Sequence, residues 1–257
     1  MITYRIAAFL FSGLLSLAPP TLALAHLASG QTANQYLNTT ETVAKYSAKD
    51  FAPDGDLSKP IWKQAHWVEF DHDPTGTIEN PAIKTRVAAV WSDRYIYFAF
   101  SGHYESLNIF EGEDVIKERW ELWNRDVVEV FLNPEPNRIS HYYEFEVAPN
   151  NQWIDLEIDK TKTPFNDPSW NSKFEHATKI NEKQHLWLTE MRIPLSAIGV
   201  DAIHTGDIWR VNFFRAAGHG GDDHRVFLAW GSIPQGGTFH VPNRFGILGF
   251  VKQPSAD

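Results

Sequence analysis

Short segments in which apolar and polar residues alternate, each closed by turn-forming residues, constrain the fold of this chain most. Two of them, Ile83–Trp91 and Tyr95–His103, flank the polar break Ser92-Asp93-Arg94. Alternation with a period of two is typical of strands, and the short polar break predicts a hairpin. No long amphipathic helix competes with this pattern, so we expect a fold built almost entirely of β-strands.

The same pattern continues to the end of the chain. We expect further strands at Asp126–Leu132, His141–Ala148, Trp153–Ile158, Phe174–Ile180, Leu186–Ile193, Asp207–Arg215, Val226–Trp230 and Phe245–Phe250. Glu105–Trp123 is irregular or weakly helical, and Pro194–Ile198 predicts a short helical turn. About ten short strands with such turns predict an all-β fold, a distorted antiparallel β-sandwich of jelly-roll or immunoglobulin-like type.

The first 25 residues have the pattern of a secretory signal peptide. Arg5 supplies a positive charge, Ile6–Ala18 is apolar but short for a bilayer span, and Ala23-Leu24-Ala25 is a cleavage signal. We therefore predict cleavage after Ala25 and a secreted or periplasmic protein, with no membrane span after cleavage. The competing interpretation is an uncleaved N-terminal anchor. Residues 26–45 predict a flexible polar lead-in, and residues 46–252 predict one domain.

Composition excludes several classes of function. The net charge of −9 argues against nucleic acid and anionic membrane surfaces as partners. The chain has no cysteine, which excludes disulfides, cysteine-ligated metals and lipid attachment through cysteine. Ten Trp and eight Tyr are many for this length, and such side chains serve both cores and half-wet binding faces.

Seven motifs, in order along the chain, resemble family 9 carbohydrate-binding modules. They are Asp54-Gly55-Asp56 with Trp62 and Ala65, Val90–Tyr97, Trp123 with Asp126–Phe131, Tyr142–Val147, Thr189–Pro194, Gly206-Asp207 with Arg210–Phe213, and Phe239-His240 with Pro242, Phe245 and Gly246. The resemblance covers about Phe51 to Val251. It implies a distorted antiparallel β-sandwich that holds the reducing-end sugar of a polysaccharide between two tryptophans, with structural calcium nearby.

The resemblance implies a partly altered binding site. Trp123 matches the first sandwiching ring, Glu129 the acidic sugar ligand, and Arg225 a sugar-binding arginine. Three positions depart from the family pattern: the second ring falls on Phe239, a further arginine on Glu146, and a glutamine on Phe214. His240, beside Phe239, is a further candidate for a hydrogen bond to ligand.

The residues themselves leave alternatives open. Trp123 precedes a strand, where its ring could stack on a sugar or could cover the core. Glu129 alternates with Val128 and Val130, so it faces a ligand if these valines point inward, or else a solvated strand face. Phe239 follows the Gly236-Gly237-Thr238 loop, which could bring its ring close to a ligand, although Phe is also at home in a core. For Arg225 the alternative is a surface ion pair with Asp222 or Asp223.

Two polar loops are weak candidates for metal binding. Asp54 and Asp56 lie in a turn sequence that could offer oxygens to a structural calcium ion, although the twelve-position calcium-loop pattern is absent. His219, Asp222, Asp223 and His224 are dense in potential ligands, but their spacing matches no specific metal motif. We name no cofactor beyond this structural calcium ion.

The sequence favours an exported, non-catalytic protein that binds an oligo- or polysaccharide and is associated with polysaccharide breakdown, with a glycoside hydrolase as a possible partner. One alternative is a haem- or metal-binding sandwich, for which axial ligands would be needed. Met191, the single methionine after the predicted signal peptide, alternates with Thr189 and Ile193 and is interpreted as core. The other alternative is a hydrolase, which needs two carboxylates across the sugar bond; no such pair is singled out.

Overall fold

The computed structural model describes residues 37, 38, 40–112, 116–218 and 224–252. The predicted signal peptide and most of the predicted lead-in lie outside these residues. So do His219, Asp222 and Asp223. Within the described residues, no helix is long and apolar enough to span a bilayer.

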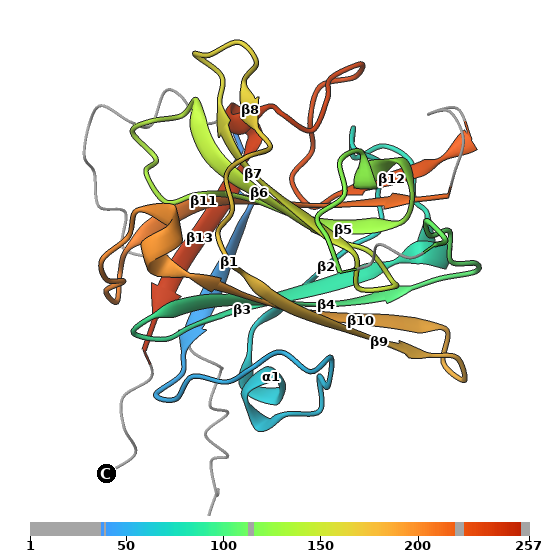
Figure 1. Ribbon diagram of the computed structural model, residues 1–257, viewed down its shortest axis with the longest axis horizontal. Coiled ribbons are helices and arrows are strands. Elements are labelled where there is room, and N and C mark those ends of the chain that lie inside the picture. The colour runs from blue at the N-terminus through green and yellow to red at the C-terminus, as the bar shows by residue number, and fades with distance from the viewer. Residues whose placement is uncertain (1–36, 39, 113–115, 219–223, 253–257) are drawn as a thin grey trace, which may run out of the picture. The chain divides into compact units, whose positions relative to one another are not determined.

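The described residues fold into thirteen strands and few helical segments (Figure 1). The strands are β1 (Glu41–Tyr46), β2 (Trp67–Phe70), β3 (Thr85–Trp91), β4 (Tyr95–His103), β5 (Val127–Asn133), β6 (His141–Val147), β7 (Trp153–Asp159), β8 (Asn166–Asp167), β9 (Glu175–Asn181), β10 (Leu186–Pro194), β11 (Ile208–Ala217), β12 (Val226–Ala229) and β13 (Gly246–Val251). The helical segments are α1 (Pro60–Gln64) and the 3-10 turns η1 (Pro81–Ile83), η2 (Leu122–Asn124), η3 (Leu195–Ile198) and η5 (Pro242–Arg244). The all-β prediction is confirmed, and η3 is the predicted helical turn.

The strands form one curled sheet that folds over itself into two layers (Figure 1). Its order is β8-β7-β6-β5-β11-β13-β1-β3-β4-β10-β9, with β12 added beside β11 and β2 beside β3. One layer holds β5, β6, β7 and β11, and the other holds β3, β4, β9 and β10. Most pairs are antiparallel as predicted, but β1 runs parallel to both β13 and β3.

Strand β1 corrects the prediction of a flexible lead-in through residue 45. Glu41 to Lys45 pair with β13, and Ala44 to Tyr46 pair with β3. Ala44 is fully buried. The domain therefore begins earlier than residue 46, and this strand joins the two layers.

The main core lies between the two layers. Alternate residues of β5 (Val128, Val130) and of β4 (Phe98, Phe100) belong to one buried apolar cluster. Met191 on β10 is fully buried in the same cluster, which confirms its interpretation as core. Because side chains alternate along a strand, the other residues of β5 face away from this core.

Both outer faces of the sandwich are also covered. Helix α1 packs Trp62 onto β3 and β4, over Val90 and Tyr97. On the opposite outer face, Phe131 of β5, Tyr142 of β6 and Phe214 of β11 form a second buried cluster beneath the loops that precede η5. This covered face, not the core between the layers, carries the polar residues considered below.

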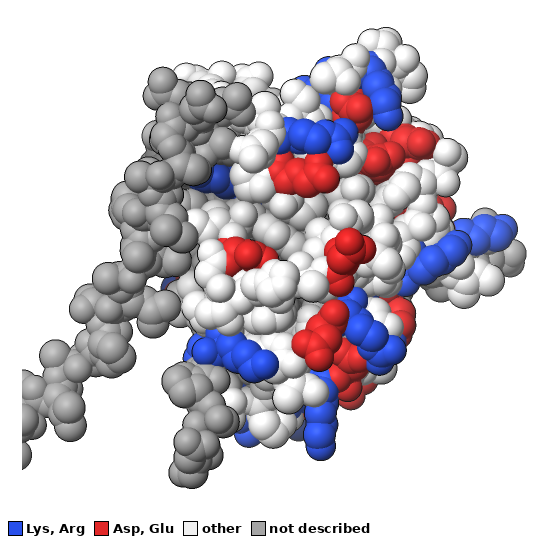
Figure 2. Space-filling model, turned by 90° about the vertical axis from the view of Figure 1, so that its left-hand side faces the viewer, with Lys and Arg blue, Asp and Glu red and all other residues white. Residues whose placement is uncertain are grey.

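Surface charges are mixed on the side of the molecule seen in Figure 2. Lys and Arg are interspersed with Asp and Glu there, with wide uncharged areas between them. A continuous basic surface, which nucleic-acid backbones require, is not present on the described part of this side.

Candidate functional site

A pocket of about 600 Å³ opens on the outer face formed by β5, β6 and β11. All six residues predicted to bind a ligand line it: Trp123, Glu129, Glu146, Arg225, Phe239 and His240. They come from η2, β5, β6, the segment before β12 and the loop before η5. The fold therefore gathers residues that lie up to 117 positions apart in the sequence.

Three glutamates lie together in this pocket. Glu129 on β5 pairs directly with Glu146 on β6, while Glu144 on β6 pairs with Phe131. One carboxylate oxygen from each of the three lies within 4.8 Å of the others. Within the described part of the chain, this is the one group of three or more acidic or histidine side chains that close together. Below, Glu129, Glu144 and Glu146 are called the glutamate triad.

The triad is buried, so its charges are poorly solvated. Glu129, Glu144 and Glu146 are 2%, 3% and 0% exposed. Burial raises the pKa of Glu144 to about 7. Burial, followed by the charge of Glu144, raises the pKa of Glu129 well above its usual range, although Arg225 acts in the opposite direction. Burial and the charges of the other two raise the pKa of Glu146 in the same way.

The position of Glu129 follows its strand pattern, but its environment is not a solvated strand face. Val128 and Val130 point into the main core, as one alternative required, and Glu129 points the other way. Loops and aromatic side chains cover this face, which explains the burial. Glu144 was not predicted to be a site residue. It lies two positions from both Tyr142 and Glu146 on the same strand and therefore shares their face.

Aromatic rings form the rim of the pocket. Phe239 stacks on Phe214, with ring centroids 4.0 Å apart and planes 7° apart, so one of its faces is covered. Trp123 is half-buried and meets Trp120 edge to face at 5.0 Å. Gly236, at φ +73, lies in the turn that leads to Phe239 and adopts a backbone conformation that other residues rarely take. This turn brings the Phe239 ring over the strands.

Arg225 and His240 are held by neighbours at the rim. The Arg225 guanidinium donates through Nη1 to the Trp123 carbonyl oxygen and lies 4.8 Å from the centre of the Phe227 ring. His240 Nδ1 is 2.9 Å from the Tyr142 hydroxyl, and its Nε2 is 3.9 Å from Glu144. Burial lowers the pKa of His240 to about 4, so this ring is neutral near pH 7. Phe227, like Glu144, lines the pocket but was not predicted from the sequence.

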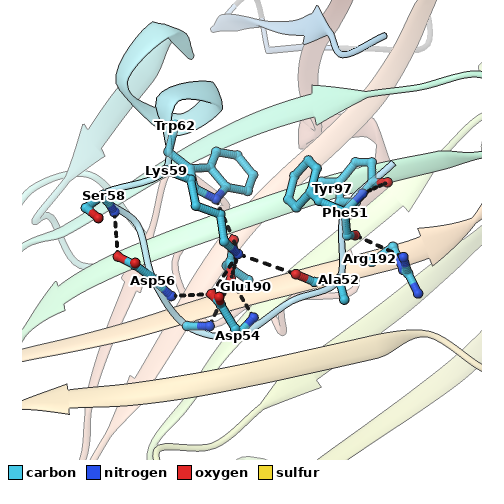
Figure 3. Close-up of polar contacts among 11 residues, drawn as sticks. Phe51, Ala52, Asp54, Asp56, Ser58, Lys59, Trp62, Tyr97, Glu190 and Arg192 are labelled. Atoms are coloured by element: carbon cyan, nitrogen blue, oxygen red, sulfur yellow. Dashed lines mark hydrogen bonds and ion pairs between the residues drawn. The ribbon is translucent and has the colours of Figure 1, made fainter. Parts of the chain in front are cut away.

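The metal candidates Asp54 and Asp56 lie elsewhere, beside α1 (Figure 3). The Asp54 carboxylate is 2.7 Å from Lys59 Nζ, and this contact holds the pKa of Asp54 down at about 2. Asp56 accepts a hydrogen bond from the Ser58 amide. The backbone amides of Asp54 and Gly55 both donate to the buried Glu190 at 2.8 Å. The turn thus has a structural role around Glu190, and calcium binding there stays a prediction.

The candidate metal loop lies largely outside the described residues. His224 is described and is exposed in the segment before β12. It is not among the residues that line the pocket.

A β-sandwich with an aromatic-rimmed pocket on one covered face has the geometry that is typical of small-molecule sites. Residues 54–253 match the carbohydrate family 9 binding domain-like family. The chain belongs to this family.

The chain is also similar in sequence to one known protein and in fold to solved structures. An "Extracellular protein" of Arthroderma benhamiae is 25% identical over 196 residues, which cover 71% of this chain and 85% of that protein. The fold is similar to that of a family 9 carbohydrate-binding module from Caldicellulosiruptor kristjanssonii in complex with cellotriose (TM-score 0.61, 17% identity, 84% of this chain and 96% of that one). It is also similar to a candidate carbohydrate-binding protein from Bacteroides uniformis (TM-score 0.67, 16% identity, 82% and 99%).

Proposed function

We propose that this protein is an exported, non-catalytic sugar-binding protein that holds a saccharide in the pocket between Trp123 and Phe239. The observation that carries the proposal is the convergence of all six candidate residues on one pocket in a chain of this family. Carbohydrate binding is a property of the family, and solved family 9 modules hold cellotriose and glucose.

The chemistry of the pocket suits a saccharide. A sugar ring has an apolar C–H face, which an aromatic ring can cover without removing water from the hydroxyls. Carboxyl oxygens accept hydrogen bonds from hydroxyls, and a guanidinium such as that of Arg225 donates to sugar oxygens. A pocket of about 600 Å³ falls in the size range of small-molecule sites.

We place the protein outside the cell or in the periplasm, where it would act beside an enzyme that breaks down polysaccharide. The pattern of residues 1–25 and the extracellular relative support this location. The partner enzyme is inferred from the ligand class alone.

Calorimetric titration with cellobiose, xylobiose and their reduced alditols, with Trp fluorescence followed in parallel, tests the proposal. Binding that is lost when the sugar end is reduced would indicate a clamp for reducing ends. Binding of both forms would indicate recognition along the chain. No binding of any glycan would contradict the proposal.

A hydrolase is a second candidate, because Glu144 has a pKa near 7 and lies beside other carboxylates. A buried carboxyl group with a raised pKa is the usual general acid in glycoside cleavage. Release of reducing sugar from xylan or cellulose, abolished by Glu129→Gln, would favour this candidate. Absence of turnover on these substrates by a protein that binds them would exclude it.

A further inference from the structure

The glutamate triad places three carboxyl groups in the pocket with little positive charge beside them. Three carboxylates converge within 4.8 Å, while Arg225 is the cation that acts on Glu129. His240 is neutral near pH 7, and the Lys160 ammonium donates to the His240 carbonyl oxygen at 2.7 Å. The pocket therefore needs a further positive charge, or else protons, to keep three carboxylates together.

A second observation points to a ligand. Glu146 is fully buried, and neither of its carboxylate oxygens has a hydrogen-bond partner outside the triad among the described residues. Buried polar atoms in native proteins are nearly always satisfied, so an unsatisfied carboxylate that lines an open pocket indicates a missing donor. Glu129 and Glu144 each have one such oxygen as well.

The size and lining of the pocket indicate which kind of ligand carries that donor. A bare ion would fill only a small part of about 600 Å³. The rest of the lining is largely apolar and aromatic, including Trp123, Phe227 and Phe239. Such rings attract cations through their faces and cover the C–H face of a sugar.

Among sugars, an amino sugar matches this lining best. A neutral sugar offers hydroxyl donors but no positive charge to offset the three carboxylates. A protonated amino group offers three N–H donors and one positive charge at a single atom, which suits three converging acceptors. An N-acetyl group removes that charge.

We propose that the pocket selects a saccharide with a protonated amino group, such as a glucosamine oligosaccharide, whose ammonium lies against Glu129, Glu144 and Glu146. The sugar ring lies against Trp123 and Phe239. This inference rests on the proposed function, because it names the class of saccharide that the same site takes.

Calorimetry on the full chain tests the inference with three β-1,4 disaccharides: that of glucosamine, cellobiose and N,N′-diacetylchitobiose. Each titration is run with and without EDTA. We expect the glucosamine disaccharide to bind at least about tenfold more tightly than the other two, as hydrogen bonds to charged groups commonly contribute. EDTA should have no effect.

Two variants test whether the glutamate triad causes the preference for the glucosamine disaccharide. Glu146→Gln keeps the shape of the side chain and removes one charge, so the preference for the glucosamine disaccharide over cellobiose should fall about tenfold. Glu129→Gln should lower it in the same direction. Glu135→Gln, an exposed residue paired with Arg138 and outside the pocket, is the matched control and should leave both affinities unchanged.

The outcomes separate the two proposals. Equal affinity for cellobiose and the glucosamine disaccharide, or equal affinity for the N-acetylated form, would overturn the inference and leave the proposed function standing. Binding that EDTA abolishes and CaCl₂ restores would also overturn it, because a metal ion would then occupy the carboxylates. No binding of any of the three sugars would overturn the inference, and no binding of xylobiose as well would overturn the proposed function.

Discussion

At the scale of single residues, the hydrogen-bond partners of a buried acidic side chain decide its role. Glu129 and Glu190 are both acidic strand residues that are almost fully buried. Glu190 is surrounded by donors: Lys59 Nζ at 2.7 Å, the Trp62 indole N–H and two backbone amides (Figure 3). Glu129 faces other carboxylates instead. The first arrangement stabilises the fold, whereas the second is typical of a functional site.

Removal of the charge at Glu190 should destabilise the protein. Glu190→Ala leaves Lys59 and the two amides without their common acceptor, and breaking such a buried network costs about 3 kcal/mol. Urea unfolding measures this loss. Glu175→Ala removes the partner of Arg192 at a half-exposed site and serves as the control, with an expected cost below about 1 kcal/mol. Equal effects of the two variants would refute the structural role given to Glu190.

The glutamate triad should make stability depend on pH. Because folding raises the pKa values of the triad, the folded protein holds more protons than the unfolded chain above the usual glutamate pKa. The contribution of the triad to the free energy of unfolding should therefore be fully present below about pH 4.5. It should be lost as pH rises through about 7, the pKa of Glu144. Among the described residues, the other charged and titratable groups that act on the triad or on its direct neighbours are Tyr142, Lys160, Arg225 and His240.

Glu146→Gln isolates this effect. The variant has one fewer buried carboxyl group, so its free energy of unfolding should decline less steeply between about pH 5 and about pH 8. Chemical unfolding at several pH values gives the two slopes, and Glu135→Gln should run parallel to the wild type. Identical slopes for Glu146→Gln and the wild type would mean that the triad is not protonated in the folded protein.

At the scale of elements, the site depends on strand register. Glu129 and Glu146 meet because β5 and β6 are antiparallel neighbours in the register that pairs these two residues. Like charges placed directly opposite one another on a sheet are destabilising. The pairing of Glu129 with Glu146 therefore favours the binding of a positively charged ligand. A shift by one residue would turn the glutamates into the main core, so the valines on the other face of β5 hold this register.

Strand β1 should be required for stability. It pairs with β13 on one side and β3 on the other, and it joins the two layers. A chain that starts at Ser47 should melt about 10 °C or more below one that starts at Leu37, as loss of several kcal/mol does in a domain of this size. Thermal unfolding compares the two chains. Equal melting temperatures would mean that β1 adds no stability, as the predicted flexible lead-in requires.

At the scale of the whole molecule, the sequence predicted the fold well where its signals were local. All ten expected strands are present within a residue or two, since alternation and turn residues act over short distances. Strands β1, β2 and β8 were missed. β1 follows a polar segment, β2 has only four residues and β8 only two, so their periodicity is weak and their pairing partners are distant in sequence.

The site was predicted unevenly for a related reason. The resemblance pointed to six residues that the structure gathers around one pocket, but the closeness of Glu144 to Glu129 depends on the pairing of β5 with β6. The burial of the triad depends on loops contributed by the last quarter of the chain. Both the strand pairing and the cover over the triad depend on contacts between segments that are distant in sequence, so no single segment predicts them.

Calorimetric titration of Trp123→Ala with the tightest-binding glycan tests the central claim most directly. Loss of an aromatic anchor should weaken binding by about 2 kcal/mol or more, while the circular dichroism and unfolding transition stay those of a folded protein. Trp120→Ala, which removes an exposed ring outside the pocket lining, is the control and should have a smaller effect. Unchanged affinity in a folded Trp123→Ala protein would contradict the assignment of this pocket as the sugar site.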